Sequence, residues 1–247
     1  MPGFFFACRG ATISDVKVAL LMPAAGSGQR LGLSLPKGLV PIEGVPLVRL
    51  SLERFAAVDS LVEVIVAVPQ GALVDFSRAL EGIELPTADV KVLAGAATRQ
   101  ESVRGALDAL ESDADLVCVH DAARPMVKAD SIDAVLAAAE RDGAATVASR
   151  PGDSVRRDDG DGGTVALDRG SIWLVETPQA FQRELIEKAH REAKAVGLEA
   201  TDDASLVEAC GSAITVLESV GANPKITRSW DLELVRLMGG AKHRGPR

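Results

Sequence analysis

The sequence predicts an α/β fold: a single three-layer α/β/α domain with a mostly parallel, Rossmann-like sheet and a protruding β-hairpin arm. Apolar runs of strand length alternate along the chain with segments whose apolar residues recur at helical spacing, which is typical of parallel strands joined by crossover helices. Aromatic residues make up only 3% of the 247 residues, and tyrosine is absent. Ala, Val, Leu and Ile must therefore fill the core, as they do in sheets covered by helices on both faces.

Six apolar runs are predicted to be buried strands because they are short and rich in aliphatic residues. They span residues 16–22, 62–68, 90–94, 116–119, 145–148 and 214–217. Six further segments have helical periodicity and are predicted to be helices. They span residues 46–57, 72–80, 98–110, 131–141, 181–195 and 203–210. Since strand–helix–strand crossovers within one sheet are right-handed, this order predicts one sheet with helices on both faces.

Two of these helices carry start signals. Thr98 and Glu101 have the spacing of a capping box, in which each side chain accepts a hydrogen bond from the other residue's backbone N–H. Thr201 is expected to cap the helix at residues 203–210, and Asp202 and Asp203 would favour its positive end. A place in a binding site remains the alternative for both acidic residues.

Residues 150–170 break the alternation, since they contain four Arg, five Asp and five Gly and little that could enter a core. The centre of this segment, residues 158–163, predicts a turn between two extended arms. A loop of this length inside a domain is usually functional or disordered. A calcium loop would need a bidentate Glu at its twelfth position, where this chain has Gly170. We therefore expect a hairpin arm.

Composition and charge restrict the class of protein. We expect residues 15–240 to form the domain, with a loosely ordered extension at residues 1–14 and a basic, solvated tail at residues 241–247. The formal net charge of −8 argues against a general nucleic-acid binder, which would show a basic face. No apolar run approaches the roughly 18 residues needed to cross a bilayer.

The cysteines indicate the compartment. Cys8, Cys118 and Cys210 are widely spaced, without metal-binding or redox spacing. They are typical of reduced thiols in a cytoplasmic protein. The apolar residues 4–8 are too few, and lack the basic flank, to be a signal peptide.

The first strand runs directly into a Gly-rich loop at residues 23–31, and small residues there let backbone N–H groups approach an anion. A Walker A loop would need Gly-Lys-Ser/Thr, which is absent. A dinucleotide fold would need its third glycine one place before Gly32 and an acidic residue after the second strand, where the chain reads Val-Pro-Gln. Arg30 and Lys37 instead supply two cations beside the loop, which is what a triphosphate needs. The alternative for either residue is a solvated surface cation.

Five motifs, in order, carry a family resemblance. The pattern A-G-x-G-x-R-L at residues 25–31, followed by P-K at 36–37, resembles the opening signature of nucleotidyltransferases that activate sugars and alcohols. The motif H-D-A-A-R-P at 120–125 follows the fourth predicted strand, at the ligand-binding end of such sheets. With T-P-Q at 177–179, T-D-D-A-S at 201–205 and K-I-T at 225–227, the chain resembles the 2-C-methyl-D-erythritol 4-phosphate cytidylyltransferase family of the non-mevalonate isoprenoid pathway.

The resemblance implies a homodimeric enzyme that uses CTP, a polyol phosphate and Mg²⁺, with residues 150–170 reaching over the partner's active site. It implies that the catalytic residues are Arg30, Lys37, Arg169 and Lys225. The implied nucleotide-binding residues are Pro23, Ala24, Ala25, Gly26, Gly28, Gly95, Ala96, Arg99, Ser102, Asp121 and Ala122, with Asp121 also at the metal. The implied substrate-binding residues are Arg124, Ser154, Arg169, Thr177, Thr201 and Lys225.

Two positions depart from the family pattern. Residues 95–97 read Gly-Ala-Ala where relatives often have Gly-Gly-Asp, so an acidic contact to the nucleotide is lost. Ser154 stands where Thr is usual and keeps the hydroxyl. The first departure bears on specificity for cytosine, and neither affects Arg30 or Lys37.

The implied nucleophile, a phosphate monoester with a second pKa of about 6, is already anionic and needs no general base. His120 is therefore expected to be an ordered histidine at a strand end rather than the catalyst, with contact to a ligand as the alternative. A ribitol 5-phosphate cytidylyltransferase and a non-catalytic nucleotide-binding regulatory domain remain the rival functions.

Overall fold

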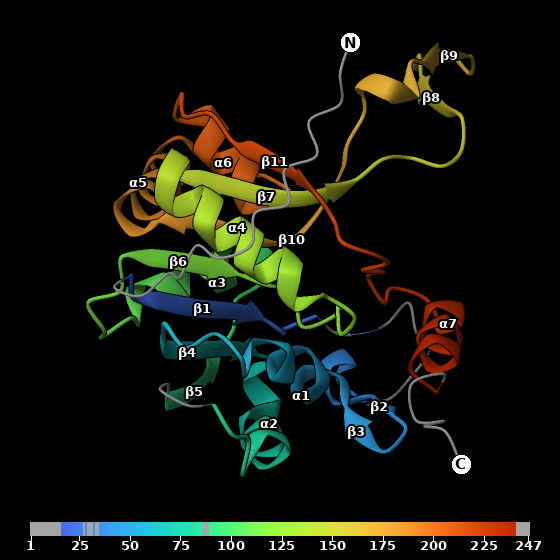
Figure 1. Ribbon diagram of the computed structural model, residues 1–247. Helices are drawn as coiled ribbons and strands as arrows, with labels where there is room; N and C mark the ends of the chain where they lie inside the picture. Colours follow the sequence, from blue (N-terminus) through green and yellow to red (C-terminus); the bar gives the residue numbers. More distant parts are fainter. Residues whose placement is uncertain (1–15, 27, 29–31, 33–34, 86–88, 241–247) are drawn as a thin grey trace.

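The computed structural model describes residues 16–26, 28, 32, 35–85 and 89–240 (Figure 1). The predictions for residues 1–14, for the tail at 241–247 and for Arg30 therefore lie outside the described residues.

A seven-stranded sheet forms the centre of the molecule, in the order β11-β7-β10-β6-β1-β4-β5. The strands are β1 (Val18–Pro23), β4 (Leu61–Val68), β5 (Asp89–Ala94), β6 (Leu116–Val119), β7 (Ala144–Ser149), β10 (Leu174–Gln182) and β11 (Thr215–Glu218). The six predicted strands are all present, and those that are neighbours pair in parallel. Strand β10 runs antiparallel to both of its neighbours, β6 and β7. The mostly parallel α/β sheet is thereby confirmed.

Strand β10 is not predicted by the apolar pattern. Glu176 and Pro178 interrupt its apolar run, and a proline normally argues against a central strand. The pairing of β10 with β7 is irregular between Val175 and Gln179, so Pro178 lies where the ladder is broken. The predicted helix at 181–195 began too early, because Phe181 still pairs with β6 in β10.

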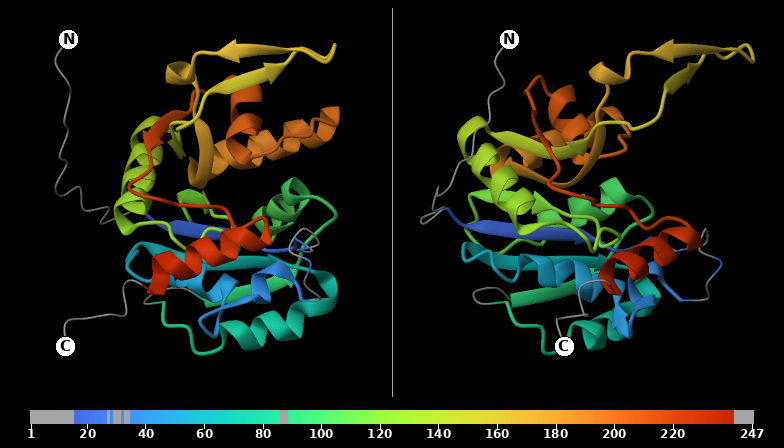
Figure 2. Two further views of the ribbon diagram at one scale, coloured as in Figure 1. Left: turned by 90° about the vertical axis from the view of Figure 1, so that its right-hand side faces the viewer. Right: turned by 45° about the vertical axis from the view of Figure 1, so that its right-hand side comes forward.

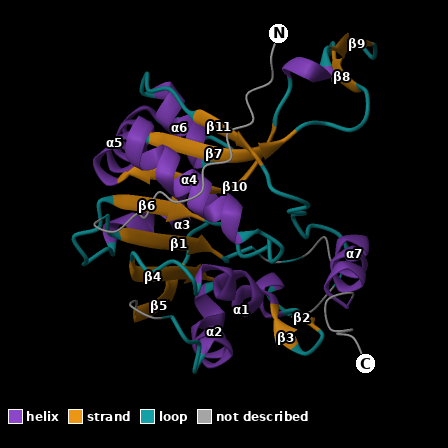
Figure 3. Cartoon of the chain, in the orientation of Figure 1, coloured by secondary structure: helices purple, strands orange, loops and turns teal. Residues whose placement is uncertain are grey.

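The helices cover both faces of the sheet (Figure 3). They are α1 (Leu47–Leu52), α2 (Leu73–Leu80), α3 (Arg99–Asp108), α4 (Ala129–Asp142), α5 (Arg183–Val196), α6 (Asp203–Ala209) and α7 (Ser229–Gly240). The six predicted helices are present, and α1 is continued by a 3-10 turn at Glu53–Phe55. Helix α7 was not among the predicted elements.

Alternate residues of β1 divide the core into two layers, because successive side chains of a strand point to opposite faces. Leu20 and Met22 pack in a cluster with residues of α1, α2 and α4. Ala19 and Leu21 pack in a second cluster with residues of α3, α5 and α6. All four side chains are fully buried. This is the predicted three-layer arrangement.

A third apolar cluster anchors the C-terminal part of the chain beside the sheet. Leu232 and Val235 of α7 pack with Ile42 and Leu47 from the short hairpin of β2 (Pro41–Ile42) and β3 (Val45–Pro46) and its continuation into α1. Ile226, also in this cluster, donates its backbone N–H to the carbonyl of Ala123 at 2.9 Å. The segment before α7 is thereby held against the loop that follows β6.

The segment at residues 150–170 contains an antiparallel hairpin of β8 (Val155–Asp158) and β9 (Thr164–Leu167). Both views of Figure 2 show this hairpin projecting from the rest of the molecule. The predicted turn between two extended arms is confirmed. None of the helices in the described part of the chain combines the length and hydropathy that crossing a bilayer requires.

Candidate active site

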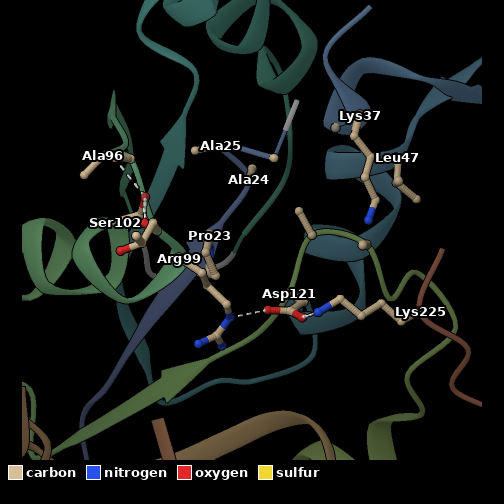
Figure 4. Close-up of a pocket in the computed structure, with 16 residues that line it drawn as sticks. Pro23, Ala24, Ala25, Lys37, Leu47, Ala96, Arg99, Ser102, Asp121 and Lys225 are labelled. Carbon is tan, nitrogen blue, oxygen red and sulfur yellow. Dashed lines mark hydrogen bonds and ion pairs between the residues drawn. The ribbon is translucent and has the colours of Figure 1, made fainter. Parts of the chain in front are cut away.

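A cavity of about 270 Å³ lies at the carboxyl ends of β1 and β6 (Figure 4). Its lining residues come from six separate stretches of the chain: Pro23, Ala24, Ala25, Gly26, Lys37, Gly38, Leu47, Ala96, Ala97, Thr98, Arg99, Ser102, Asp121, Ala122, Ala123 and Lys225. The nucleotide-binding residues implied by the resemblance are all in this set except Gly28 and Gly95. Lys37 and Lys225, two of the four expected catalytic cations, line the same cavity.

Close backbone packing shapes one wall of this cavity. The Gly95 N–H donates to the carbonyl of Val68 at 2.7 Å, and a Cβ built on Gly95 would lie 2.6 Å from the Cβ of Ala25. Only glycine can therefore approach the β1 loop at this position. The Ser102 hydroxyl accepts from the Ala96 N–H at 2.9 Å and donates to the carbonyl of Thr98 at 2.8 Å. These bonds fix the loop before α3.

Thr98 begins α3 with the capping box that its spacing predicts. The Thr98 hydroxyl accepts from the Glu101 backbone N–H, and the Glu101 carboxylate accepts from that of Thr98. The prediction is confirmed.

The prediction that Thr201 caps α6 is wrong. Asp202, which has extended backbone angles, is the N-cap and accepts from the Ser205 N–H at 3.2 Å. Thr201 lies one residue further out and is exposed.

Asp121, which follows β6, is buried and has two cations beside it. Its carboxylate contacts Lys225 Nζ at 2.5 Å through one oxygen and Arg99 Nε at 2.9 Å through the other. Burial disfavours the charged carboxylate, but Arg99 and Lys225 outweigh that effect and hold the pKa of Asp121 well below its usual range. Asp121 is therefore an anion at neutral pH, with one cation on each oxygen.

His120 is fully buried and belongs to a hydrogen-bond network behind this wall. Its Nε2 lies 3.1 Å from the carbonyl of Arg124, so Nε2 carries the hydrogen, and Nδ1 accepts from the Thr177 hydroxyl at 3.2 Å. That hydroxyl oxygen also accepts from the Asp121 N–H at 3.0 Å. Burial lowers the pKa of His120 to about 4, so the ring is neutral. The expected ordered strand-end histidine fits this geometry.

Arg124 lies outside the cavity lining and is largely buried. Its Nη1 donates to the carbonyl of Asn223 at 2.6 Å, and the carboxylate of Glu176 is 3.9 Å away. Burial lowers the pKa of Arg124. The expected roles of Arg124 and Thr177 in substrate binding stay predictions.

The arm residues do not join this cavity within the chain. Ser154 and Arg169 are exposed, and Arg169 Nη1 donates to the carbonyl of Gly152 at 2.7 Å within the arm. Their expected roles, and that of Thr201, also stay predictions.

Three comparisons with known proteins bear on the chain. The family model described as IspD, 2-C-methyl-D-erythritol 4-phosphate cytidylyltransferase, matches residues 18–238. The chain belongs to this family.

Relatives in this cytidylyltransferase family match nearly the whole chain. The protein of that name from Symbiobacterium thermophilum is 38% identical over 225 residues, which cover 91% of this chain and 93% of the relative. The one from Syntrophus aciditrophicus is 39% identical over 225 residues, 88% of this chain and 94% of the relative. The crystal structure of the enzyme from Thermus thermophilus superposes with a TM-score of 0.73 at 34% identity, covering 91% of this chain and all of that one.

Asp121 is the one carboxylate among the described residues that line the cavity. Within the described ranges, no group of three or more His, Cys, Asp and Glu side chains could hold a metal ion. Mg²⁺ is commonly bound by one or two carboxylates together with substrate phosphates and water. A single carboxylate such as Asp121 therefore fits a magnesium ion whose other ligands would be phosphate oxygens and water, as the cytidylyltransferase resemblance implies.

Some residues in or next to the cavity wall were not predicted from the sequence to be part of the site. Leu47, Gly38 and Thr98 line it, yet Leu47 and Gly38 belong to none of the motifs, and Thr98 was interpreted only as part of a capping box. Asp203 was expected only to open α6 or to bind ligand, but it is fully buried and contacts Arg99 at 2.7 Å. Its place in the motif T-D-D-A-S was the signal that could have found it.

Proposed function

We propose that the chain joins CTP to 2-C-methyl-D-erythritol 4-phosphate, giving 4-diphosphocytidyl-2-C-methyl-D-erythritol and pyrophosphate. The main support for the proposal is that the small-residue loop after β1, two lysines and Asp121 all line one cavity. The chain also belongs to the cytidylyltransferase family. Small residues leave backbone N–H groups accessible to phosphates, and the lysines supply the opposite charge.

In the proposed reaction, a phosphate oxygen of the polyol phosphate attacks the α-phosphorus of CTP. The new bond is P–O, and the bond from the α-phosphorus to the oxygen bridging to the β-phosphorus breaks, so pyrophosphate leaves with that oxygen and its electron pair. The attacking monoester is anionic at neutral pH and no proton needs to be removed. A neutral, buried His120 agrees with a reaction that needs no general base.

The main obstacle to this reaction is the repulsion between two polyanions. We assign Lys37, together with Arg30, to stabilising charge at the α-phosphorus, and Lys225 to binding the phosphate of the polyol. A magnesium ion held by Asp121 would supply further neutralisation of the triphosphate. The cavity wall at Ala96 and Ser102 would bind the cytidine.

The proposal includes a cytoplasmic homodimer in which each arm completes the partner's site. In its support, Ser154 and Arg169 are exposed, and the hairpin of the arm projects from the rest of the molecule (Figure 2). Val165, Leu174 and Val175, in and next to the arm, are also exposed apolar residues, such as a subunit contact would cover. Cys118 and Cys210 are free thiols, which agrees with a reducing compartment.

Pyrophosphate release tests the function directly. The purified chain with Mg²⁺ is given CTP, UTP, ATP or GTP, each with methylerythritol 4-phosphate or ribitol 5-phosphate. We expect release only with CTP and methylerythritol 4-phosphate. Faster release with ribitol 5-phosphate would assign the chain to the rival substrate. No release from any pair, with CTP still bound in calorimetry, would favour a regulatory nucleotide-binding protein.

A further inference from the structure

Arg99 is held between two buried carboxylates. Its Nε donates to Asp121 Oδ1 at 2.9 Å and its Nη1 donates to Asp203 Oδ2 at 2.7 Å. Arg99 and Asp121 line the cavity, whereas Asp203 lies behind them and is fully buried. Asp203 therefore reaches the cavity only through Arg99.

Three elements hold Asp203 in place. It is the first residue of α6, and its backbone N–H donates to Gln179 Oε1 of β10 at 3.2 Å. Its Oδ1 accepts from Nε2 of His190, a buried residue of α5, at 3.0 Å. With one carboxylate oxygen on His190 and the other on Arg99, Asp203 has a fixed orientation.

The position of Arg99 decides how much of Asp121 stays accessible. A guanidinium beside a single carboxylate tends to bind both of its oxygens with two parallel hydrogen bonds. Here Asp203 binds Nη1 and fixes the guanidinium plane, and Arg99 contacts Asp121 only through Nε and Oδ1. The buried Nη2 of Arg99 has no hydrogen-bond partner in the described part of the chain, so the second parallel bond to Asp121 is not made. Asp121 Oδ2 is left to Lys225, an exposed side chain that can be exchanged for another partner.

Charge balance leads to the same conclusion. Arg99 and Lys225 contribute two positive charges, and Asp121 and Asp203 contribute two negative charges. Loss of the Asp203 charge would leave Arg99, which is partly buried, as an excess cation, and Asp121 is the other carboxylate that Arg99 contacts.

We propose that Asp203 is a positioning residue that holds Arg99 in a single-bond contact with Asp121, so that one oxygen of Asp121 is available to the divalent cation that accompanies the nucleotide. His190 keeps Asp203 in the required orientation. The proposal rests on the proposed function, since it takes the site of Asp121 to be the nucleotide site.

Calorimetric titration of CTP into Asp203→Asn, with and without Mg²⁺, tests this role. The affinity for CTP with Mg²⁺ should fall by about tenfold or more, the usual effect of removing a residue that orients a metal ligand. The affinity for CTP without metal should stay the same or rise, because the variant site is more positive. A loss of equal size under both conditions would overturn the proposal, since misfolding would lower both.

Asp202→Asn is the matched control, because it makes the same chemical change one residue earlier. Asn is a good N-cap, so α6 should be preserved, and the Asp202 carboxylate accepts from Gln179 and Ser205 rather than from Arg99. We expect wild-type CTP binding under both conditions. A loss as large as that of Asp203→Asn would contradict a specific role for Asp203.

The Arg99→Gln background shows whether Asp203 acts through Arg99. Adding Asp203→Asn to Arg99→Gln should not lower the affinity for CTP any further. In the wild-type background, His190→Gln keeps an N–H donor for Asp203 and should lower the affinity for CTP with Mg²⁺ less than His190→Leu does. A further loss in the double variant would overturn the mechanism. If the wild type fails to bind CTP at all, the proposed function fails as well. If it binds and Asp203→Asn matches it, only this inference fails.

Discussion

His120 offers a stability measurement whose sign and size follow from its surroundings. In His120→Gln the amide can still donate to the carbonyl of Arg124, but the acceptor for the Thr177 hydroxyl is lost. The contact with Phe55, whose ring centroid lies 5.1 Å from that of His120, is lost as well. We expect the variant to be less stable than the wild type at pH 7 by about 1–3 kcal/mol, the effect of a buried hydrogen bond and ring packing.

The difference should shrink as the pH falls. Burial lowers the pKa of His120 to about 4 from 6.5. Above pH 6.5 the ring is neutral in both the folded and the unfolded chain, so its contribution to stability is fully present. As the pH falls from 6.5 toward 4, the unfolded chain takes up a proton that the folded chain does not, and stability is lost. Between pH 7 and pH 5 this amounts to about 2 kcal/mol.

Urea denaturation of both proteins at pH 7 and pH 5, at one protein concentration, measures the effect. Carboxylates titrate alike in the two proteins, so the difference between their free energies of unfolding isolates His120. We expect that difference to decrease by about 2 kcal/mol at pH 5. A difference that stays constant or grows would mean that folded His120 binds a proton as readily as the unfolded chain does, and would refute its burial as a neutral residue.

Three kinetic predictions follow from the proposed site. Lys37→Ala should lower kcat by about 10²-fold or more while calorimetry still shows CTP binding, because the lysine acts on the transition state. Lys194→Ala, which removes an exposed lysine, is the control and should keep the wild-type kcat. A near-normal kcat in Lys37→Ala would exclude this role. Lys225→Ala should raise KM for the polyol phosphate more than KM for CTP, because the binding free energy of the polyol phosphate weakens by ~1.5–3 kcal/mol. A larger rise in KM for CTP would assign Lys225 to the nucleotide site. Mixing inactive Lys37→Ala and Arg169→Ala dimers should restore about a quarter of wild-type activity, since half the dimers are mixed and each has one intact site. No recovery, with subunit exchange verified by mass, would place Arg169 in the site of its own chain.

The strands that the sequence predicted share one property, a short run made mostly of aliphatic residues. Strand β4, with seven of its eight residues apolar in sequence, is the clearest case. Strand β10 was missed because its burial depends on neighbours: Glu176 accepts from Ser219 and Asn223, and Gln179 from the N–H groups of Asp203 and Ala204. Polar residues become core residues when distant parts of the chain satisfy them, and no local pattern contains that information.

Local patterns in the sequence predict the fold class, the Gly-rich loop after β1 and the types of residue at the cavity, since strand periodicity and small-residue loops are local properties. Which charged residues contact one another depends on the folded chain. Lys225 pairs with Asp121 because the third apolar cluster holds the segment before α7 against the loop after β6. Arg99 and Asp203, 104 residues apart, meet because α3 and α6 pack on the same face of the sheet. Ion pairs of this kind depend on distance and burial, which only the folded chain defines.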